Sequence, residues 1–563
     1  MRLRLRAAGA AAAVGALAFA VYLPSRDARL VGLDDHVMVE RDQALHRDPA
    51  ALVRAFASSF YDTYYRPLHR ISLVLDARLS GDDPRGYHRT NAALHALACA
   101  AVLGALLALG YGLATASALA ALWAVHPALV SAVAWIPGRD NVLMTLFLLG
   151  SLVGWSRYLE ARGRAAAAGF LAIHWLLLLA AFLTKEAALA FPAAAAAFAW
   201  LWREGDLPWR RLAAGAAGWL AAFALFLALR ARVLPLEGDW QALGLDALAA
   251  SWPTPLAALG KLALPVRLSA FASLDALAVA TGVAAAAAAA VVSLRSPRVR
   301  AGRVLFGAAW LLLLIAPTLV QRTGLYDYGE YRLYWLGVGP LLALAELLRA
   351  LPPMRRAAAV LAAGVCALFA AQTLAYQRVF DGPERFWGHL VELDPGSGWG
   401  WFHVGRHLYA EGRLEDALQA YRRAQELHFE RADLYVDLSA ARLALGDAEG
   451  ASAAAARALE LEPGHPHALA NLGDAELRLG DFEAAIEALG AALDPRAEEH
   501  FRYAAPVERH AFRAHVTLRR IRAHLGAGDR EGARRLAAEL ERLGEPLPPA
   551  LARRIQRGAP PSE

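Results

Sequence analysis

Long apolar stretches separated by short charged loops make up residues 1–377 of this 563-residue chain. A helix needs about 20 mostly apolar residues to cross a bilayer, and about eleven stretches satisfy that length. The composition agrees, because 57% of the residues are hydrophobic and 20% are charged, whereas soluble proteins average about 45–50% and about 25%. We therefore predict an all-α, polytopic helix bundle rather than a uniform soluble enzyme. The predicted spans lie at about 7–25, 88–109, 113–135, 141–158, 165–184, 187–203, 211–232, 272–294, 304–321, 332–349 and 356–377.

Arginine clusters occupy alternate loops of this bundle and predict its orientation, because loops that stay in the cytoplasm carry an excess of Lys and Arg. With the N-terminus cytoplasmic, an odd number of spans places the chain after residue 377 on the outer side. The first outer loop, 26–87, contains stretches at 50–60 and 68–79 with the spacing of interfacial helices, and 253–264 is another. The arginine-rich loops are Arg157–Arg164, Arg203–Arg211, Arg295–Arg303 and Arg349–Arg356, and the other outer loops are 136–140, 185–186, 233–271 and 322–331.

The charged last third of the chain contains a repeat of 34 residues. Gly412, Gly446 and Gly480 recur at the expected turns, and Gly528 is in register after an insertion. This spacing predicts an α-solenoid of tetratricopeptide repeats, which bind extended peptides in a concave groove. We expect a protein partner, with a rigid spacer as the alternative. The predicted parts are the membrane domain 1–377, a linker 378–397, the repeats 398–550 and a tail 551–563.

Charge and cysteine content exclude two further classes. The formal net charge of +6 is small for this length and is explained by basic loops beside the membrane, so we expect no nucleic-acid partner. The two cysteines, Cys99 and Cys366, both lie inside apolar runs. A disulfide framework or a cysteine metal site is therefore not expected.

Ionisable residues near span ends gather on the predicted outer side, and in membrane proteins such groups are functional candidates. One outward-facing polar chamber would explain this one-sided placement. Each group also has an ordinary explanation, such as a solvated acid, a helix cap, a local ion pair or, for Arg139, a lipid headgroup contact. The candidates are Asp34, Asp35, His88, His126, Arg139, Lys185, Glu186, Glu330, Arg332 and Tyr334.

An acid beside several cations at a membrane surface suits inverting glycosyl transfer from a lipid-linked sugar. A lipid phosphate leaves readily, so the main need is a carboxylate base for the acceptor hydroxyl, here Asp34 or Asp35. Cations would hold the phosphate, and Lys185, Arg332 and Arg139 are the candidates. We expect His126, Glu186, Glu330, Tyr334 and His88 to support these residues or to bind the sugar. No tightly bound cofactor is expected, and the sequence leaves a divalent metal undecided.

Several short motifs, taken in order, resemble the transmembrane and tetratricopeptide repeat-containing O-mannosyltransferases and their bacterial relatives, of the GT-C glycosyltransferase class. In that family an acid often stands at the position of Asn141. The matching motifs are Asp34-Asp35, Tyr65-Arg66-Pro67-Leu68, Gly86-Tyr87-His88 with Asn91 and His95, His126-Pro127, Ala134-Trp135-Ile136-Pro137-Gly138-Arg139, Thr184-Lys185-Glu186 with Pro192, and Glu330-Tyr331-Arg332-Leu333-Tyr334.

The resemblance implies a polyprenyl-phosphate sugar donor, with mannose or another hexose as the sugar, and Ser or Thr of proteins as acceptor. It also implies that the acidic pair Asp34-Asp35 is catalytic. For a bacterial relative it implies the inner membrane, with the repeats in the periplasm. Two other readings stay open: a membrane-tethered tetratricopeptide scaffold, and a transporter, which would need polar groups near the bilayer midplane.

Overall fold

The computed structural model consists of two compact units, Met1–Leu393 and Asp394–Glu563. It describes residues 2–60, 63–203, 209–234, 245–320, 328–351, 356–494 and 506–557. Most of the predicted outer loop 322–331, parts of the arginine-rich loops, and the end of the predicted tail lie outside the described residues. Helices dominate both units, which confirms the all-α prediction apart from one pair of two-residue strands, β1 (Phe271–Ala272) and β2 (Tyr328–Gly329).

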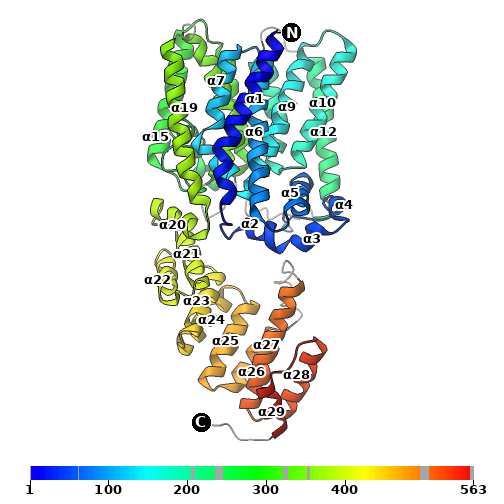
Figure 1. Ribbon diagram of the computed structural model, residues 1–563, viewed down its shortest axis with the longest axis vertical. Coiled ribbons are helices and arrows are strands. Elements are labelled where there is room, and N and C mark those ends of the chain that lie inside the picture. The colour runs from blue at the N-terminus through cyan, green and yellow to red at the C-terminus, as the bar shows by residue number, and fades with distance from the viewer. Residues whose placement is uncertain are drawn as a thin grey trace. The chain divides into compact units, whose positions relative to one another are not determined.

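Within the described part of the first unit, eight helices are long and apolar enough to cross a membrane. Figure 1 shows several of them running alongside one another, and successive contacts join α1 to α6, α6 to α9, α9 to α10 and α10 to α12. The chain is therefore a multi-pass membrane protein. The eight helices are α1 (Arg2–Tyr22), α6 (Pro84–Ala108), α9 (Arg139–Glu160), α10 (Arg164–Phe182), α12 (Trp209–Arg230), α15 (Ala276–Arg295), α16 (Ala301–Leu319) and α19 (Arg356–Gln377).

The other three predicted spans are broken or short. Helix α7 (Leu113–Ala124) bends by 57° into η3 (Pro127–Leu129) and α8 (Val130–Val133). A second pair, η7 (Glu330–Arg332) with α17 (Leu333–Leu336), bends by 49° into α18 (Val338–Leu347). Helix α11 (Phe191–Leu201) follows η5 (Glu186–Ala190) and has only 11 residues, fewer than a simple crossing needs. All eleven predicted segments are thus helical.

Short helices of the first loop gather at one end of the bundle (Figure 1). The predicted interfacial helix at 68–79 corresponds to α5 (Pro67–Ser80), which begins with proline at its first position, where no backbone N–H is needed. The one at 253–264 corresponds to α14 (Thr254–Ala263), whereas the stretch 50–60 is helical only in α4 (Ala51–Arg54). The remaining short helices are η1 (Leu23–Asp27), α2 (Asp34–His36), η2 (Val37–Arg41), α3 (Gln43–Arg47), η4 (Ile136–Gly138), α13 (Leu245–Ser251) and η8 (Leu348–Ala350).

The second unit is a series of helix pairs with the predicted period. Gly412, Gly446 and Gly480 adopt φ of +76°, +85° and +86° at the turns, a backbone conformation that favours glycine. At Gly405 an added Cβ would lie 2.4 Å from the Tyr421 ring, so a small residue is needed where the two helices touch. The helices are α21 (Gly398–Ala410), α22 (Leu414–Glu426), α23 (Ala432–Ala444), α24 (Ala448–Leu461), α25 (Pro466–Leu479), α26 (Phe482–Ala491), α27 (Pro506–Gly526), α28 (Arg530–Arg542) and α29 (Pro549–Arg557).

The predicted linker 378–397 differs from an ordinary connection. It contains η9 (Arg378–Phe380) and α20 (Pro383–Leu393), and both belong to the first compact unit. Phe386, Trp387 and Leu390 of α20 are buried there. The predicted tail likewise starts inside α29, whose Leu551 and Ile555 pack into the core of the last repeat.

Candidate functional site

Three loops of the membrane unit meet at one carboxylate, that of Asp140 in the first turn of α9. Its Oδ2 lies 3.0 Å from Arg66 Nη1 and 2.9 Å from Lys185 Nζ. Arg66 also places its Nε 2.8 Å from Glu186 Oε2, and the other oxygen of Glu186 accepts the backbone N–H of Tyr65 at 3.2 Å. This ion cluster therefore ties together the loop before α5, the start of α9 and the turn after α10.

The Lys185 side chain is the more buried of the two cations that pair with Asp140. Besides Asp140, its ammonium donates to Asn141 Oδ1 at 2.7 Å, and it lies 5.1 Å from the centres of the Tyr331 and Trp335 rings. Burial lowers the pKa of Lys185 to about 8, although the Asp140 carboxylate acts in the opposite direction. The side chain is thus mostly protonated at neutral pH.

Asp35 has a saturated carboxylate. It is 2% exposed and accepts backbone N–H groups of Val31 at 2.6 Å, Leu33 at 3.0 Å and His36 at 3.0 Å. Burial nevertheless raises the pKa of Asp35, with these hydrogen bonds acting against it. Three N–H donors on one carboxylate fix the path of the loop between η1 and α2.

Asp34 differs from its neighbour because its side chain reaches solvent. Desolvation by the surrounding protein, followed by the charge of Asp35, raises the pKa of Asp34 to about 6. The charges of Arg66 and Lys185 lower this pKa, and that of Asp140 raises it. The acid therefore lies within electrostatic range of the ion cluster.

The loop that precedes α17 adds a third cation. Arg332 lies 5.6 Å from the centre of the Tyr331 ring, which is the same ring that faces Lys185. Its Nη1 is buried and has no hydrogen-bond partner among the residues that the structure describes. Glu330 points elsewhere: it is fully buried, its Oε1 lies 3.0 Å from Lys261 Nζ, and its Oε2 accepts the N–H of Ser269 at 2.8 Å.

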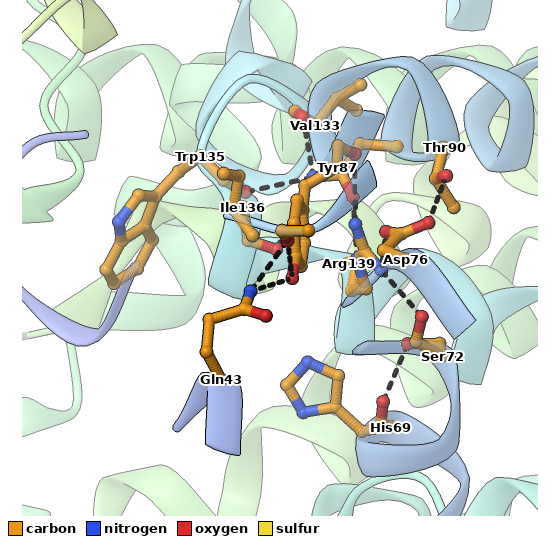
Figure 2. Close-up of polar contacts among 12 residues, drawn as sticks. Gln43, His69, Ser72, Asp76, Tyr87, Thr90, Val133, Trp135, Ile136 and Arg139 are labelled. Atoms are coloured by element: carbon orange, nitrogen blue, oxygen red, sulfur yellow. Dashed lines mark hydrogen bonds and ion pairs between the residues drawn. The ribbon is translucent and has the colours of Figure 1, made fainter. Parts of the chain in front are cut away.

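Arg139 belongs to a separate, buried network (Figure 2). Its guanidinium is 0% exposed, with Nη1 2.6 Å from Asp76 Oδ2 and 3.3 Å from Ser72 O. Nε donates to Asn91 Oδ1 at 2.8 Å and Nη2 to Tyr87 O at 2.9 Å. Every side-chain nitrogen of Arg139 is thus engaged within the protein, and the network fastens α5 to α6 and α9.

Of three other candidates, two, His126 and Tyr334, have hydrogen-bond partners away from the ion cluster. His126 caps η3 by accepting the N–H of Ala128 at 3.2 Å, and its Nε2 donates to Leu262 O at 3.0 Å. The Tyr334 hydroxyl donates to His95 Nδ1 at 2.8 Å, within a buried contact between α6 and α17. His88 is buried on α6, 3% exposed. Their assignment to sugar binding stays a prediction.

The sequence reasoning did not select three residues that the geometry makes prominent: Arg66, Asp140 and Lys261. Arg66 stands inside a motif that carried the family resemblance, and Asp140 directly follows another of these motifs, so a signal for both was present. Lys261 had none, because its partner Glu330 is distant in the chain and a lysine on an interfacial helix resembles a solvated charge. In the described ranges, no group of three or more His, Cys, Asp and Glu could hold a metal ion.

Comparisons with known proteins found one family model and several partial relatives. The tetratricopeptide repeat family matches residues 442–505. The mouse protein O-mannosyl-transferase TMTC2 is 32% identical over 167 residues, 27% of this chain and 19% of the relative. The protein O-mannosyl-transferase Tmtc1 of Drosophila melanogaster is 30% identical over 187 residues, 32% of this chain and 21% of the relative. The alignments thus span about a fifth of these relatives.

Among solved structures, the MamA protein crystal structure is 18% identical and covers 34% of this chain and 92% of its own, with a TM-score of 0.25. YrrB, described as a TPR protein with an unusual peptide-binding site, is 16% identical and covers 31% of this chain and 83% of its own, also with a TM-score of 0.25. Tetratricopeptide arrays bind protein or peptide partners, which is the class of interaction that the repeat unit offers.

We predict that Asp76→Asn destabilises the membrane unit by about 3–5 kcal/mol, because it leaves the Arg139 guanidinium buried without its counter-ion. The measurement is the thermal unfolding midpoint of the purified protein in detergent. Asp82→Asn, which changes an exposed acid just beyond α5, serves as the matched control and should leave the midpoint unchanged. Equal midpoints for the two variants would show that the Arg139 network contributes little to stability.

Proposed function

We propose that this protein is a GT-C-type glycosyltransferase that moves a sugar, mannose or another hexose, from a polyprenyl-phosphate donor to hydroxyls of a protein acceptor. The observation that carries the proposal is the solvent-facing Asp34 within electrostatic range of Arg66 and Lys185. The partial relatives, which are named protein O-mannosyl-transferases, support the same activity.

Asp34 is the proposed base. The acceptor oxygen attacks the anomeric carbon, the bond from that carbon to the phosphate oxygen breaks with its electron pair, and the hydroxyl proton passes to the Asp34 carboxylate. A single displacement of this kind inverts the anomeric configuration. Asp35 cannot receive the proton without losing backbone hydrogen bonds, so its proposed role is to hold the loop that presents Asp34.

Arg332 and Lys185 are the proposed phosphate ligands. Arg332 has a buried Nη1 without a hydrogen-bond partner in the described part of the chain, and burial of an unpaired donor is costly unless a ligand satisfies it. Lys185 already holds Asp140 and Asn141, so it would contribute mainly charge. Arg66 is fixed between two carboxylates, and Arg139 is fully engaged; we assign both to the framework.

The repeat unit would capture the polypeptide acceptor. From the charge pattern of the loops we expect both the repeats and the ion cluster on the outer side. For a bacterial protein that side is the periplasm. The membrane-tethered scaffold remains the second candidate, because the repeat match alone would support it. A scaffold would bind its partner equally well in every variant of the ion cluster, whereas sugar transfer would be absent from the wild type.

We predict that Asp34→Asn lowers kcat by about 10²–10⁴-fold, the range for loss of a general base, without lowering the unfolding midpoint. Asp35→Asn, in contrast, should lower the unfolding midpoint, because an amide accepts fewer hydrogen bonds than the carboxylate at the turn. The assay follows transfer from a panel of polyprenyl-phosphate sugars to peptides, with and without chelator. Asp27→Asn, a surface acid in the same loop, is the control; near-normal transfer by Asp34→Asn would refute the base assignment.

The rate should depend on pH with two limbs. Asp34 accepts a proton only when ionised, so kcat/KM should rise as the pH increases through about 6. Lys185 holds phosphate only when protonated, so the same parameter should fall above a pH of about 8. Initial rates between pH 5 and 9 at constant ionic strength provide the measurement. A flat profile below pH 7 would be incompatible with Asp34 as the titrating base.

We predict that Arg332→Gln raises the apparent KM for the donor by about 10–100-fold, the equivalent of one lost charge-assisted hydrogen bond of about 1.5–3 kcal/mol. The KM for the peptide acceptor should stay near that of the wild type. Arg89→Gln, on the exposed side of α6, is the matched control. An unaltered KM for the donor, measured with saturating acceptor, would contradict the assignment of Arg332 as a phosphate ligand.

A further inference from the structure

Residues 378–393, which join the last span to the repeats, dock onto the membrane unit instead of crossing solvent. Figure 1 shows α20 at the end of α19. Phe386 of α20 packs against Phe380 of η9, with ring centres 5.5 Å apart, and against Phe271 of β1 at 6.1 Å. A linker that only spanned the distance to the repeats would not need to bury these aromatic rings.

At its start, this segment binds the loop that carries the acidic pair. Asp381 Oδ1 accepts the backbone N–H of Arg29 at 3.2 Å, and Arg29 Nη2 donates to Asp381 O at 3.2 Å. The two side chains also form an ion pair of 3.6 Å. Arg29 stands two residues before Val31, whose N–H holds Asp35. The position of the acidic loop is therefore set in part by Asp381.

At its other end, the same segment binds the loop that positions Arg332. His389 Nε2 donates to Leu268 O at 2.8 Å, and Arg267 Nη2 donates to Leu393 O at 3.4 Å. Ser269, which follows Leu268 in the chain, donates its N–H to Glu330. Strand β1 pairs with β2, which ends immediately before Glu330. Displacement of Leu268 would thus be transmitted to the turn that carries Arg332.

We propose that Asp381 and His389 are positioning residues of the transfer site, because one short segment holds both the loop of Asp34 and the loop of Arg332. The inference rests on the proposed function for the identity of the site. The contacts that carry it are polar and directed at loop backbone, whereas anchoring of the repeats alone would need only the buried rings of α20.

The test compares Asp381→Asn and His389→Ala with the wild type in the full chain. We expect each variant to lower kcat about 10-fold, since small displacements of reacting groups are costly, while the apparent KM for the peptide acceptor stays unchanged. His389→Gln, which keeps an N–H donor, should recover most of the rate. Glu384→Gln, an exposed change on the same helix, is the matched control.

Amide hydrogen exchange supplies a readout that needs no activity. Asp381→Asn should speed exchange in the peptide containing Val31 and Leu33, and His389→Ala in the peptide containing Ser269, with the midpoint of unfolding unchanged. Wild-type exchange in both peptides would overturn the positioning roles, even if transfer were impaired. If the wild type transfers no sugar from any donor while the two variants show these exchange changes, the proposed function is refuted and the positioning contacts stand.

Discussion

The geometry of the candidate site depends on the ion pairs that the Asp140 carboxylate forms. One oxygen pairs with both Arg66 and Lys185, so three loops that are distant in sequence converge on a single atom. Paired charges that are mostly buried are stabilising only when hydrogen bonds satisfy them. Here Glu186 also pairs with Arg66, and Asn141 also accepts from Lys185, whereas the buried Oδ1 of Asp140 has no hydrogen-bond partner among the described residues. The Asn141 amide binds the Lys185 ammonium without neutralising it, which would leave positive charge available for the proposed phosphate ligand.

The two neighbouring acids illustrate how environment separates chemically identical groups. Asp35 is surrounded by backbone N–H donors and cannot move without unravelling its turn, whereas Asp34 faces solvent and cations. A base must be reachable by the acceptor and must titrate near the working pH, and the proposal of Asp34 as the base rests on its exposure and on its pKa of about 6. In the proposed mechanism the tightly bonded Asp35 would hold the loop that presents Asp34, so the two adjacent acids would have different roles.

Local patterns predicted the parts of the fold that local physics determines. Apolar length predicted the spans, and the period with Gly412, Gly446 and Gly480 predicted the repeats, because each repeat packs only against its neighbours. The candidate site was harder. Arg139 and Lys185 are both cations at span ends. Only the placement of Asp76 on α5 shows that the Arg139 guanidinium is paired within the protein. Lys261 and the docking of α20 depend on contacts between distant segments, for which the sequence carries no periodic signal.

The arrangement of cations also favours a group-transfer site over a carrier. The described charges of the ion cluster come from loops and helix ends, and the buried Arg139 network anchors those loops to the bundle. A carrier must release such contacts in each cycle to expose the site on the other side. Charge pairs that hold three loops to one another oppose that release, because each opening would leave buried charges unpaired. Rigid cations beside a solvent-facing acid instead suit an enzyme that stabilises developing phosphate charge without rearrangement.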